Sequence, residues 1–270
     1  MAKSENIYYP TGETEKTFVN SIWWLSEDDL HNRKEIILPK GTVEIIFNFS
    51  DNIIYLNPTL RVSKMLPIVF INGNNFKPFE LIKTGRQEFL GIQLKSAGLK
   101  LIFNLSVKEF NDKVYAGNEI GCHLDLLADE LFFAKTFQQK VEIILKWLEQ
   151  RISKKNYPYF IERVRKLQCL GSDRNLTVKD LCQEIYISDR QLRRISSDWL
   201  GMSIEEYILY NKYLTSLHLL HNTNLYLTDV GYKAGYYDQS HFIREFKSYT
   251  ELTPKQYRKA NKDLPGHIFL

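Results

Sequence analysis

The chain has 270 residues, of which 44% are hydrophobic and 25% are charged, with 13 glycines and 8 prolines. This composition is close to the globular average and excludes collagen-like, low-complexity and largely disordered proteins. At about 100 to 200 residues per domain, the length favours two domains. No apolar stretch approaches the roughly 20 residues of a membrane span, and residues 1–10 do not resemble a secretory signal. We therefore expect a cytoplasmic protein that does not contact membranes.

The net charge of +4 is weighted toward the C-terminus. Residues 160–270 carry 16 basic and 13 acidic side chains, whereas residues 1–159 carry 20 basic and 19 acidic side chains. Three widely spaced cysteines, Cys122, Cys169 and Cys182, predict reduced thiols instead of a disulfide framework or a zinc site.

The first hundred residues predict an antiparallel β barrel or sandwich. Short apolar or alternating runs are separated by turn residues such as Pro39-Lys40-Gly41 and Asn57-Pro58, at a spacing typical of these folds. The predicted strands are 35–39, 42–49, 53–56, 66–71 and 88–94.

From about residue 96 the pattern changes to one typical of helices, which predicts a helical connector over 96–157 and a domain boundary near Pro158. One apolar stripe has members three or four residues apart: Phe137, Val141, Ile144, Leu148 and Ile152. Two interpretations of the stripe are open. It packs against its own domain, or it is a dimerisation seam like a short coiled coil.

Residues 177–200 have the pattern of a helix-turn-helix unit. Thr177 and Ser188 are the predicted N-caps of its two helices, and Gly201 ends the second helix. The residues expected on the buried side of the second helix are Leu192, Ile195 and Trp199. The residues left near its N-terminal half, where a recognition helix meets base edges, are Arg190, Gln191, Arg193 and Arg194.

The pattern occurs a second time over residues 228–249. A longer helix, from the capping box of Ser203 and Glu206 to about residue 221, separates the two units and would span roughly 27 Å. Thr228 is the predicted N-cap of the next helix, and Asp238 opens a recognition helix over 239–249.

The second recognition helix has Phe242 and Phe246 on its expected buried edge. The side chains left for a DNA groove are Gln239, Ser240, His241, Arg244 and Lys247. Thr253, followed by Pro254 at the first helical position, predicts a closing helix.

A stiff helix between two such units would let both recognition helices enter successive major grooves, roughly 34 Å apart. Arginine chelates guanine and glutamine pairs with adenine, and each such contact discriminates between bases by roughly 1 to 3 kcal/mol. The predicted DNA contacts are Ser188, Arg190, Gln191, Arg193, Arg194, Gln239, Ser240, His241, Arg244 and Lys247.

The run Ser240-His-Phe-Ile-Arg-Glu-Phe-Lys247, followed by Leu252-Thr-Pro-Lys-Gln-Tyr-Arg258, resembles the signature of the AraC/XylS family of transcription regulators. The resemblance covers about residues 160–262 and implies an all-α module with two helix-turn-helix units. The chain departs from the family pattern at Tyr186 and Glu251, where glycine is usual, and at Ser196, Ser197, Lys212 and Ser216.

The N-terminal half resembles a less common sensor domain of some regulators in this family, through the runs 38–49 and 90–100. The resemblance implies a cupin-like β domain with a helical tail that binds an effector or a partner subunit. The histidines are scattered and lack the cupin metal pattern, and no phosphate loop or nucleophile motif stands out. We therefore predict no catalytic residue, no metal and no cofactor.

Together these patterns predict an α+β protein. Its N-terminal antiparallel β barrel or sandwich with a helical connector covers residues 1–157, and its all-α double helix-turn-helix module covers residues 158–270. The predicted function is sequence-specific DNA binding that regulates transcription. The expected partners are double-stranded DNA, a small-molecule effector, RNA polymerase and a second copy of the chain. The alternatives are a protein-interaction adaptor with a degenerate DNA-binding module, and a cupin-type enzyme.

Overall fold

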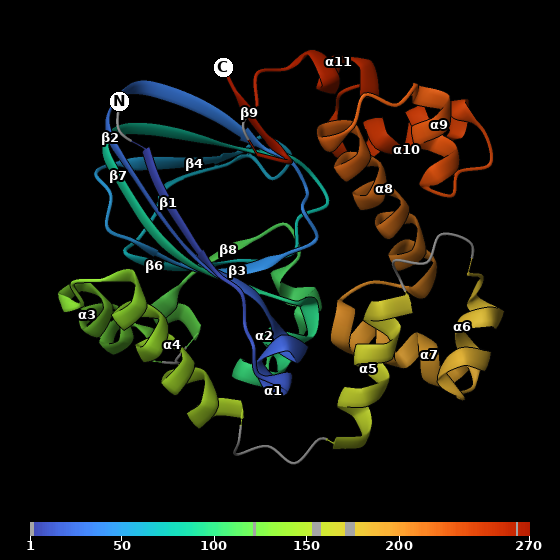
Figure 1. Cartoon of the computed structure of the whole chain (residues 1–270), viewed down its shortest axis with the longest axis horizontal. Helices are drawn as coiled ribbons and strands as arrows, with labels where there is room; N and C mark the ends of the chain where they lie inside the picture. Colours follow the sequence, from blue (N-terminus) through green and yellow to red (C-terminus); the bar gives the residue numbers. More distant parts are fainter. Residues whose placement is uncertain (1–2, 121–122, 153–157, 171–175, 263) are drawn as a thin grey trace. The chain divides into compact units, whose positions relative to one another are not determined.

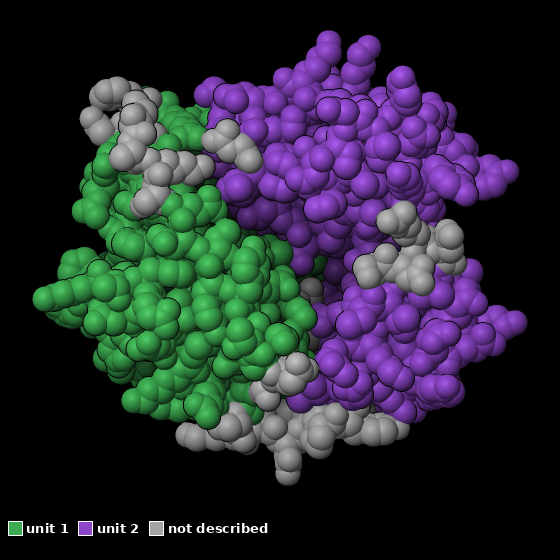
Figure 2. Space-filling view, in the orientation of Figure 1, with its two compact units in different colours: residues 1–34, 42–74, 80–156 green, residues 35–41, 75–79, 157–270 purple. Residues whose placement is uncertain are grey.

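The structure, a computed structural model, describes residues 3–120, 123–152, 158–170, 176–262 and 264–270. The chain divides into two compact units (Figures 1 and 2). Unit 1 comprises residues 1–34, 42–74 and 80–156, and unit 2 comprises residues 35–41, 75–79 and 157–270. Unit 2 therefore includes two short segments of the N-terminal half.

One sheet contains nine strands, in the order β1-β2-β7-β3-β6-β8, with β4 pairing with β5 and β7, and β9 pairing with β2. Every pairing with a described register is antiparallel, which confirms the predicted antiparallel β architecture of an α+β fold. The strands are β1 (Lys3–Tyr8), β2 (Val19–Ile37), β3 (Val43–Asn48), β4 (Ile53–Asn57), β5 (Val62–Met65), β6 (Val69–Asn72), β7 (Phe79–Leu94), β8 (Val114–Ala116) and β9 (His267–Phe269).

The long strand β7 changes partner along its length. Its first part pairs with β4, with Lys83 opposite Ile53, and its last part pairs with β3, with Leu94 opposite Val43. A strand that pairs with different neighbours along its length lets a sheet bend sharply, as in barrels and sandwiches.

The region predicted to be helical from residue 96 contains α2 (Ser96–Phe103), α3 (Leu124–Phe133) and α4 (Phe137–Ile152), but also the strand β8. This strand pairs with β6, with Tyr115 opposite Ile71. A helix α1 (Glu13–Phe18) precedes β2, and 3₁₀ turns span 107–110 and 117–120. The predicted end of the connector falls on residues 153–157, which lie outside the described residues.

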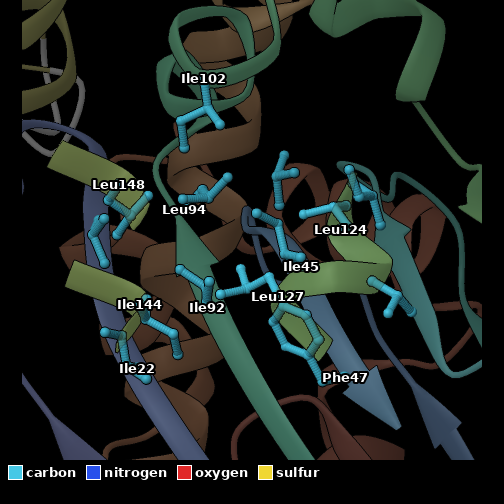
Figure 3. Packing of buried hydrophobic residues seen from close by; sticks show 14 of the residues in the cluster. Ile22, Ile45, Phe47, Ile92, Leu94, Ile102, Leu124, Leu127, Ile144 and Leu148 are labelled. Carbon is cyan, nitrogen blue, oxygen red and sulfur yellow. The ribbon is translucent and has the colours of Figure 1, made fainter. Parts of the chain in front are cut away.

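The apolar stripe of α4 packs into the core of unit 1. Val141, Ile144 and Leu148 are buried there with residues of β3, β7 and α3, and Phe137 and Ile152 pack at the edge (Figure 3). The stripe therefore packs against its own domain, and its interpretation as a dimerisation seam is wrong because these side chains are already covered.

A lysine also lies on the buried side of α4. Lys140 is 3% exposed, its Nζ donates a hydrogen bond to the Leu131 carbonyl, and it lies 5.9 Å and 5.4 Å from the ring centres of Trp24 and Phe49. Burial lowers the pKa of this amine, and the nearby Glu88 partly opposes that shift. The aromatic rings and the carbonyl compensate in part for the water that the ammonium loses.

We expect Ile144→Ala to destabilise unit 1 by about 2 to 4 kcal/mol, because it leaves a cavity in a fully buried part of the core. Urea denaturation followed by circular dichroism measures this change. The matched control is Glu142→Ala on the exposed side of the same helix, which should change stability by less than about 0.5 kcal/mol. Equal effects of the two substitutions would contradict the assignment of the buried face.

The helices of unit 2 are α5 (Pro158–Leu170), α6 (Val178–Ile185), α7 (Asp189–Ile195), α8 (Ile204–Asn222), α9 (Leu227–Lys233), α10 (Gln239–Thr250) and α11 (Pro254–Lys259). Within the described part of the chain, no helix has the length and apolarity needed to cross a bilayer.

Candidate nucleic-acid interface

The first helix-turn-helix unit consists of α6 and α7. Thr177 caps α6 by accepting a hydrogen bond from the Asp180 backbone N–H, and Asp180 accepts in return from the Thr177 backbone N–H at 2.8 Å. Leu181 and Ile185 are buried beneath the helix. The predicted start of this unit is therefore confirmed, because the cap satisfies N–H groups that have no partner within the helix.

Ser188 caps the recognition helix α7 with the help of Gln191. The Gln191 Oε1 accepts hydrogen bonds from the backbone N–H and the hydroxyl of Ser188, at 3.0 and 3.3 Å. In this state the acceptor atom of Gln191 holds the helix end. Gln191 would have to release that cap before it could make a bidentate contact with adenine.

The three arginines of α7 have different surroundings. Arg193 pairs with Asp189 on its own helix and, at 2.8 Å, with Glu205 at the start of α8. Hydrogen bonds to Asp189 and Glu205 raise the pKa of Arg193, so the guanidinium is always charged. Arg190 and Arg194 are also exposed on this helix. The carboxylates therefore partly neutralise the positive edge of α7.

The buried side of α7 contains Leu192 and Ile195, with Trp199 on the turn that follows, as predicted. The predicted helix over 189–200 is confirmed in extent, but its last part differs in type: α7 ends at Ile195 and residues 196–200 continue as a π-helical turn. Ser196, fully buried, donates from its hydroxyl to the Met202 carbonyl at 2.8 Å. Gly201 then ends the turn in the left-handed conformation, with φ 73°.

The helix α8 separates the two helix-turn-helix units. It has 19 residues, or about 28 Å, and it begins with the predicted capping box of Ser203 and Glu206. Figure 1 shows α7 beside the N-terminal end of α8, and α9 with α10 beside its C-terminal end.

The second unit consists of α9 and α10. The predicted cap at Thr228 is wrong: α9 begins at Leu227, two residues earlier than that cap implies, and Thr228 lies inside its first turn. Asp238 caps α10 as predicted, by accepting from the His241 backbone N–H at 2.7 Å. Phe242 and Phe246 are 0% exposed on the buried edge of α10.

The opposite edge of α10 is polar and open to solvent. Gln239, Ser240, Arg244 and Lys247 are exposed, and the side chain of Arg244 keeps 75% of its accessible surface. His241 is partly buried against the edge of the Tyr236 ring and lies 4.0 Å from Glu245. Four of the five predicted contacts of this helix are therefore on one accessible side, and His241 is at its margin.

Two departures from the family pattern fall on left-handed residues. Tyr186 ends α6 with φ 56° and ψ 50°, and Glu251 ends α10 with φ 61° and ψ 0°. Side chains other than glycine rarely adopt this conformation, because their Cβ crowds the backbone. Glycine, which the family resemblance places at both positions, would remove this strain.

We expect Tyr186→Gly and Glu251→Gly each to stabilise unit 2 by about 0.5 to 1 kcal/mol, since each removes left-handed strain at a helix end. Thermal unfolding of the full chain measures the change. The control is Glu184→Gly, an exposed position inside α6, where glycine should cost about 1 kcal/mol. A loss of stability in all three variants would contradict the conformational argument.

Several tyrosines of unit 2 are buried. Tyr213 is 0% exposed, its ring stacks on Tyr249 at 4.6 Å between centroids, and it contacts Phe246 at 5.7 Å. Burial raises the pKa of Tyr207 and Tyr249 to about 12 and that of Tyr213 well above its ordinary value.

These shifts predict alkaline unfolding of unit 2. A raised folded-state pKa adds stability that is complete below the ordinary pKa of about 10 and is lost as the pH rises toward about 12. Tyrosinate absorbance and helical circular dichroism should therefore change together in this range. Ionisation of all 16 tyrosines before any loss of helix signal would contradict this expectation.

Sequence patterns did not reveal two features of this region, the N-terminal segments of unit 2 and the pairing of β9. Residues 35–41 and 75–79 belong to the same compact unit as the helix-turn-helix helices, and β9 pairs with the end of β2, with Ile268 opposite Ile36.

The described residues contain no cluster of three or more side chains suited to a metal ion. Cys169 and Cys182 form no disulfide within the described part of the chain, and Cys122 lies outside it.

Two helix-turn-helix units joined by one helix define a tandem helix-turn-helix DNA-binding domain. Residues 181–260 match a family model described as a helix-turn-helix domain (HTH_18), and residues 15–116 match a domain of unknown function (DUF6597). The C-terminal part of this chain therefore matches a helix-turn-helix domain family and is similar to named transcription regulators.

Curated relatives are similar over this C-terminal part. The Msm operon regulatory protein of Streptococcus mutans is 28% identical over 100 residues, which is 37% of this chain and 36% of the relative. The activator RhaR of Escherichia coli is 30% identical over 80 residues, which is 30% of this chain and 28% of the relative. The chain thus spans about a third of the length of these relatives.

Two solved structures are also similar. ToxT from Vibrio cholerae, in a form bound to an unsaturated fatty acid, has a TM-score of 0.48 at 16% identity, covering 95% of this chain and 94% of that chain. A transcriptional regulator from Chromobacterium violaceum with an AraC-type DNA-binding domain has a TM-score of 0.35 at 22% identity, covering 36% of this chain and 89% of that chain.

Proposed function

We propose that this chain is a sequence-specific DNA-binding transcription regulator that inserts α7 and α10 into successive major grooves. The observation that carries the proposal is the polarity of α10. Its Phe242 and Phe246 edge is fully buried, while Gln239, Arg244 and Lys247 are exposed on the other side. Donors and cations on an accessible helix edge are what base edges and phosphates bind.

In this proposal the second helix-turn-helix unit contributes more to base discrimination than the first unit. Arg244 is largely exposed and has one long ion pair, with Glu245 at 3.8 Å, whereas Gln191 caps its own helix and Arg193 is paired with two carboxylates. Exposed ion pairs contribute only about 0 to 1 kcal/mol, so Arg193 can exchange its carboxylates for guanine at small cost. Arg190 and Arg194 supply further positive charge to the first unit.

The N-terminal half supplies control in this proposal. Unit 1 has its own hydrophobic core, and it contains most of the segment that matches a separate family model. We propose that it binds a small-molecule effector or a second copy of the chain, and that the regulator acts in the cytoplasm, contacts RNA polymerase and has no enzymatic activity. The curated relatives carry the names of operon regulators and activators, which supports regulation over catalysis.

A selection of random duplexes with the full chain tests the function. We expect a preferred sequence, with affinity falling steeply as salt rises because bound phosphates release counterions. Equal binding to every duplex would contradict sequence-specific regulation and would instead favour the protein-interaction adaptor.

Two variants of α10 separate specificity from general affinity. Arg244→Ala should reduce discrimination at one or two base positions by about 1 to 3 kcal/mol. Lys247→Ala, its matched control on the same helix, should weaken binding to all duplexes about equally and lower the salt slope by about 1. Equilibrium binding to single-base variants of the selected duplex measures both effects. If Arg244→Ala behaves like Lys247→Ala, α10 does not read bases through Arg244.

A further inference from the structure

Two buried tyrosines of α8 hold the N-terminal segments that belong to unit 2. The Tyr210 hydroxyl donates to the Asn75 carbonyl at 2.8 Å and accepts from the Gly41 backbone N–H at 2.9 Å. The Tyr213 hydroxyl donates to the Pro39 carbonyl at 2.9 Å. Both side chains are almost fully buried, so each hydroxyl depends on these partners in place of water.

The same tyrosine rings pack directly against the recognition helix α10. Tyr249 lies 5.3 Å from Tyr210 and 4.6 Å from Tyr213 between ring centroids, and Phe246 lies 5.7 Å from Tyr213. Since Phe246 is on the buried edge of α10, a shift of either tyrosine changes the surface on which the helix rests. Close-packed rings transmit such shifts because interiors contain little free volume.

Two lysines reinforce the same arrangement. Lys77, in segment 75–79, donates to the Ser248 carbonyl near the end of α10 at 2.7 Å. Lys212 on α8 donates to the Gly235 carbonyl, in the turn between α9 and α10, at 2.7 Å. The second helix-turn-helix unit is thus tied both to α8 and to a segment of the N-terminal half.

The two segments are continuous with strands of the sheet. Segment 35–41 runs from the end of β2 toward β3, and segment 75–79 runs from β6 into β7. A change in the sheet that moves these strand ends therefore acts on the partners of the two tyrosine hydroxyls.

We propose that Tyr210 and Tyr213 are positioning residues for DNA reading. Their hydroxyls fix segments 35–41 and 75–79, their rings support α10, and the N-terminal half thereby sets how the second helix-turn-helix unit meets its bases. This proposal rests on the proposed function, since it concerns how the same recognition helix is placed.

The test uses the full chain and the duplex selected by the wild-type protein, with every single-base change measured. Positions where Arg244→Ala or Gln239→Ala reduces discrimination define the part read by α10. The double variant Tyr210→Phe with Tyr213→Phe keeps both rings and removes both hydroxyls. We expect it to reduce discrimination at the α10 positions about 3- to 10-fold, and to leave the remaining positions unchanged.

A substitution in the N-terminal segment should have the same effect. In Gly41→Ala the new Cβ would lie 2.5 Å from Leu214 Cδ1, so the Leu214 side chain or segment 35–41 must shift, and alanine strains the left-handed backbone at φ +70°. The matched control is Gly85→Ala in unit 1, which has φ +72° and a similarly close neighbour in the Asp51 carboxylate. It should cost comparable stability and leave base discrimination intact.

Titration with excess duplex gives the active fraction of each variant, so partial unfolding is separated from altered reading. Equal losses at all positions, unchanged discrimination at the α10 positions, or an effect of Gly85→Ala equal to that of Gly41→Ala would each overturn the proposal. It is overturned too if neither Arg244→Ala nor Gln239→Ala defines any position. A wild-type chain without sequence preference would contradict the proposed function itself, which is a distinguishable result.

Discussion

The helix-turn-helix module depends on satisfying the backbone N–H groups at the start of very short helices. The helices α6, α7 and α11 have eight, seven and six residues, and isolated helices below about 12 residues are marginal in water. Each begins with a side-chain cap, and such caps contribute about 1 kcal/mol each. The capping boxes are those of Thr177 with Asp180, Ser188 with Gln191, Ser203 with Glu206, and Thr253 with Gln256.

Capping and recognition compete for the same side chains in the first unit. Gln191 is one of the predicted base contacts, yet its oxygen accepts hydrogen bonds from Ser188. The cap of α10 comes from Asp238, which precedes the helix, so the cap does not use the side chains of Gln239 and Arg244. The two units therefore have similar folds but differ in which residue supplies the cap.

Much of the C-terminal half could be predicted from the sequence because its signals are local. Caps, helix ends and buried pairs such as Phe242 and Phe246 lie within four residues of one another. The strand β2 was missed before residue 35, and its middle part, residues 26–34, is mostly polar or charged and shows no apolar alternation. Residues 22–27 of this strand are held by pairing with β1, with Lys3 opposite Glu27. A three-residue strand such as β9 is too short to produce a pattern.

The roles of the buried tyrosines could not be predicted for a different reason. Tyr207, Tyr210 and Tyr213 recur every three residues, which indicates only that they share one side of a helix. The partners of the latter two hydroxyls are backbone atoms of residues 39, 41 and 75, more than 130 positions away. Every residue type has a backbone carbonyl, and all but proline have a backbone N–H, so the sequence cannot indicate which of them a tyrosine hydroxyl will bind.

The attachment of Tyr210 and Tyr213 to distant carbonyls limits how freely this module can be recombined. A chimera that fuses residues 158–270 to an unrelated sensor would remove the acceptors at Pro39 and Asn75, so a new surface that covers the two tyrosines would have to supply other acceptors. Each orphaned hydroxyl would cost about 1 to 3 kcal/mol. Domain exchange in this lineage would thus require such new acceptors, phenylalanine at both places, or transfer of the two short loops along with the helices.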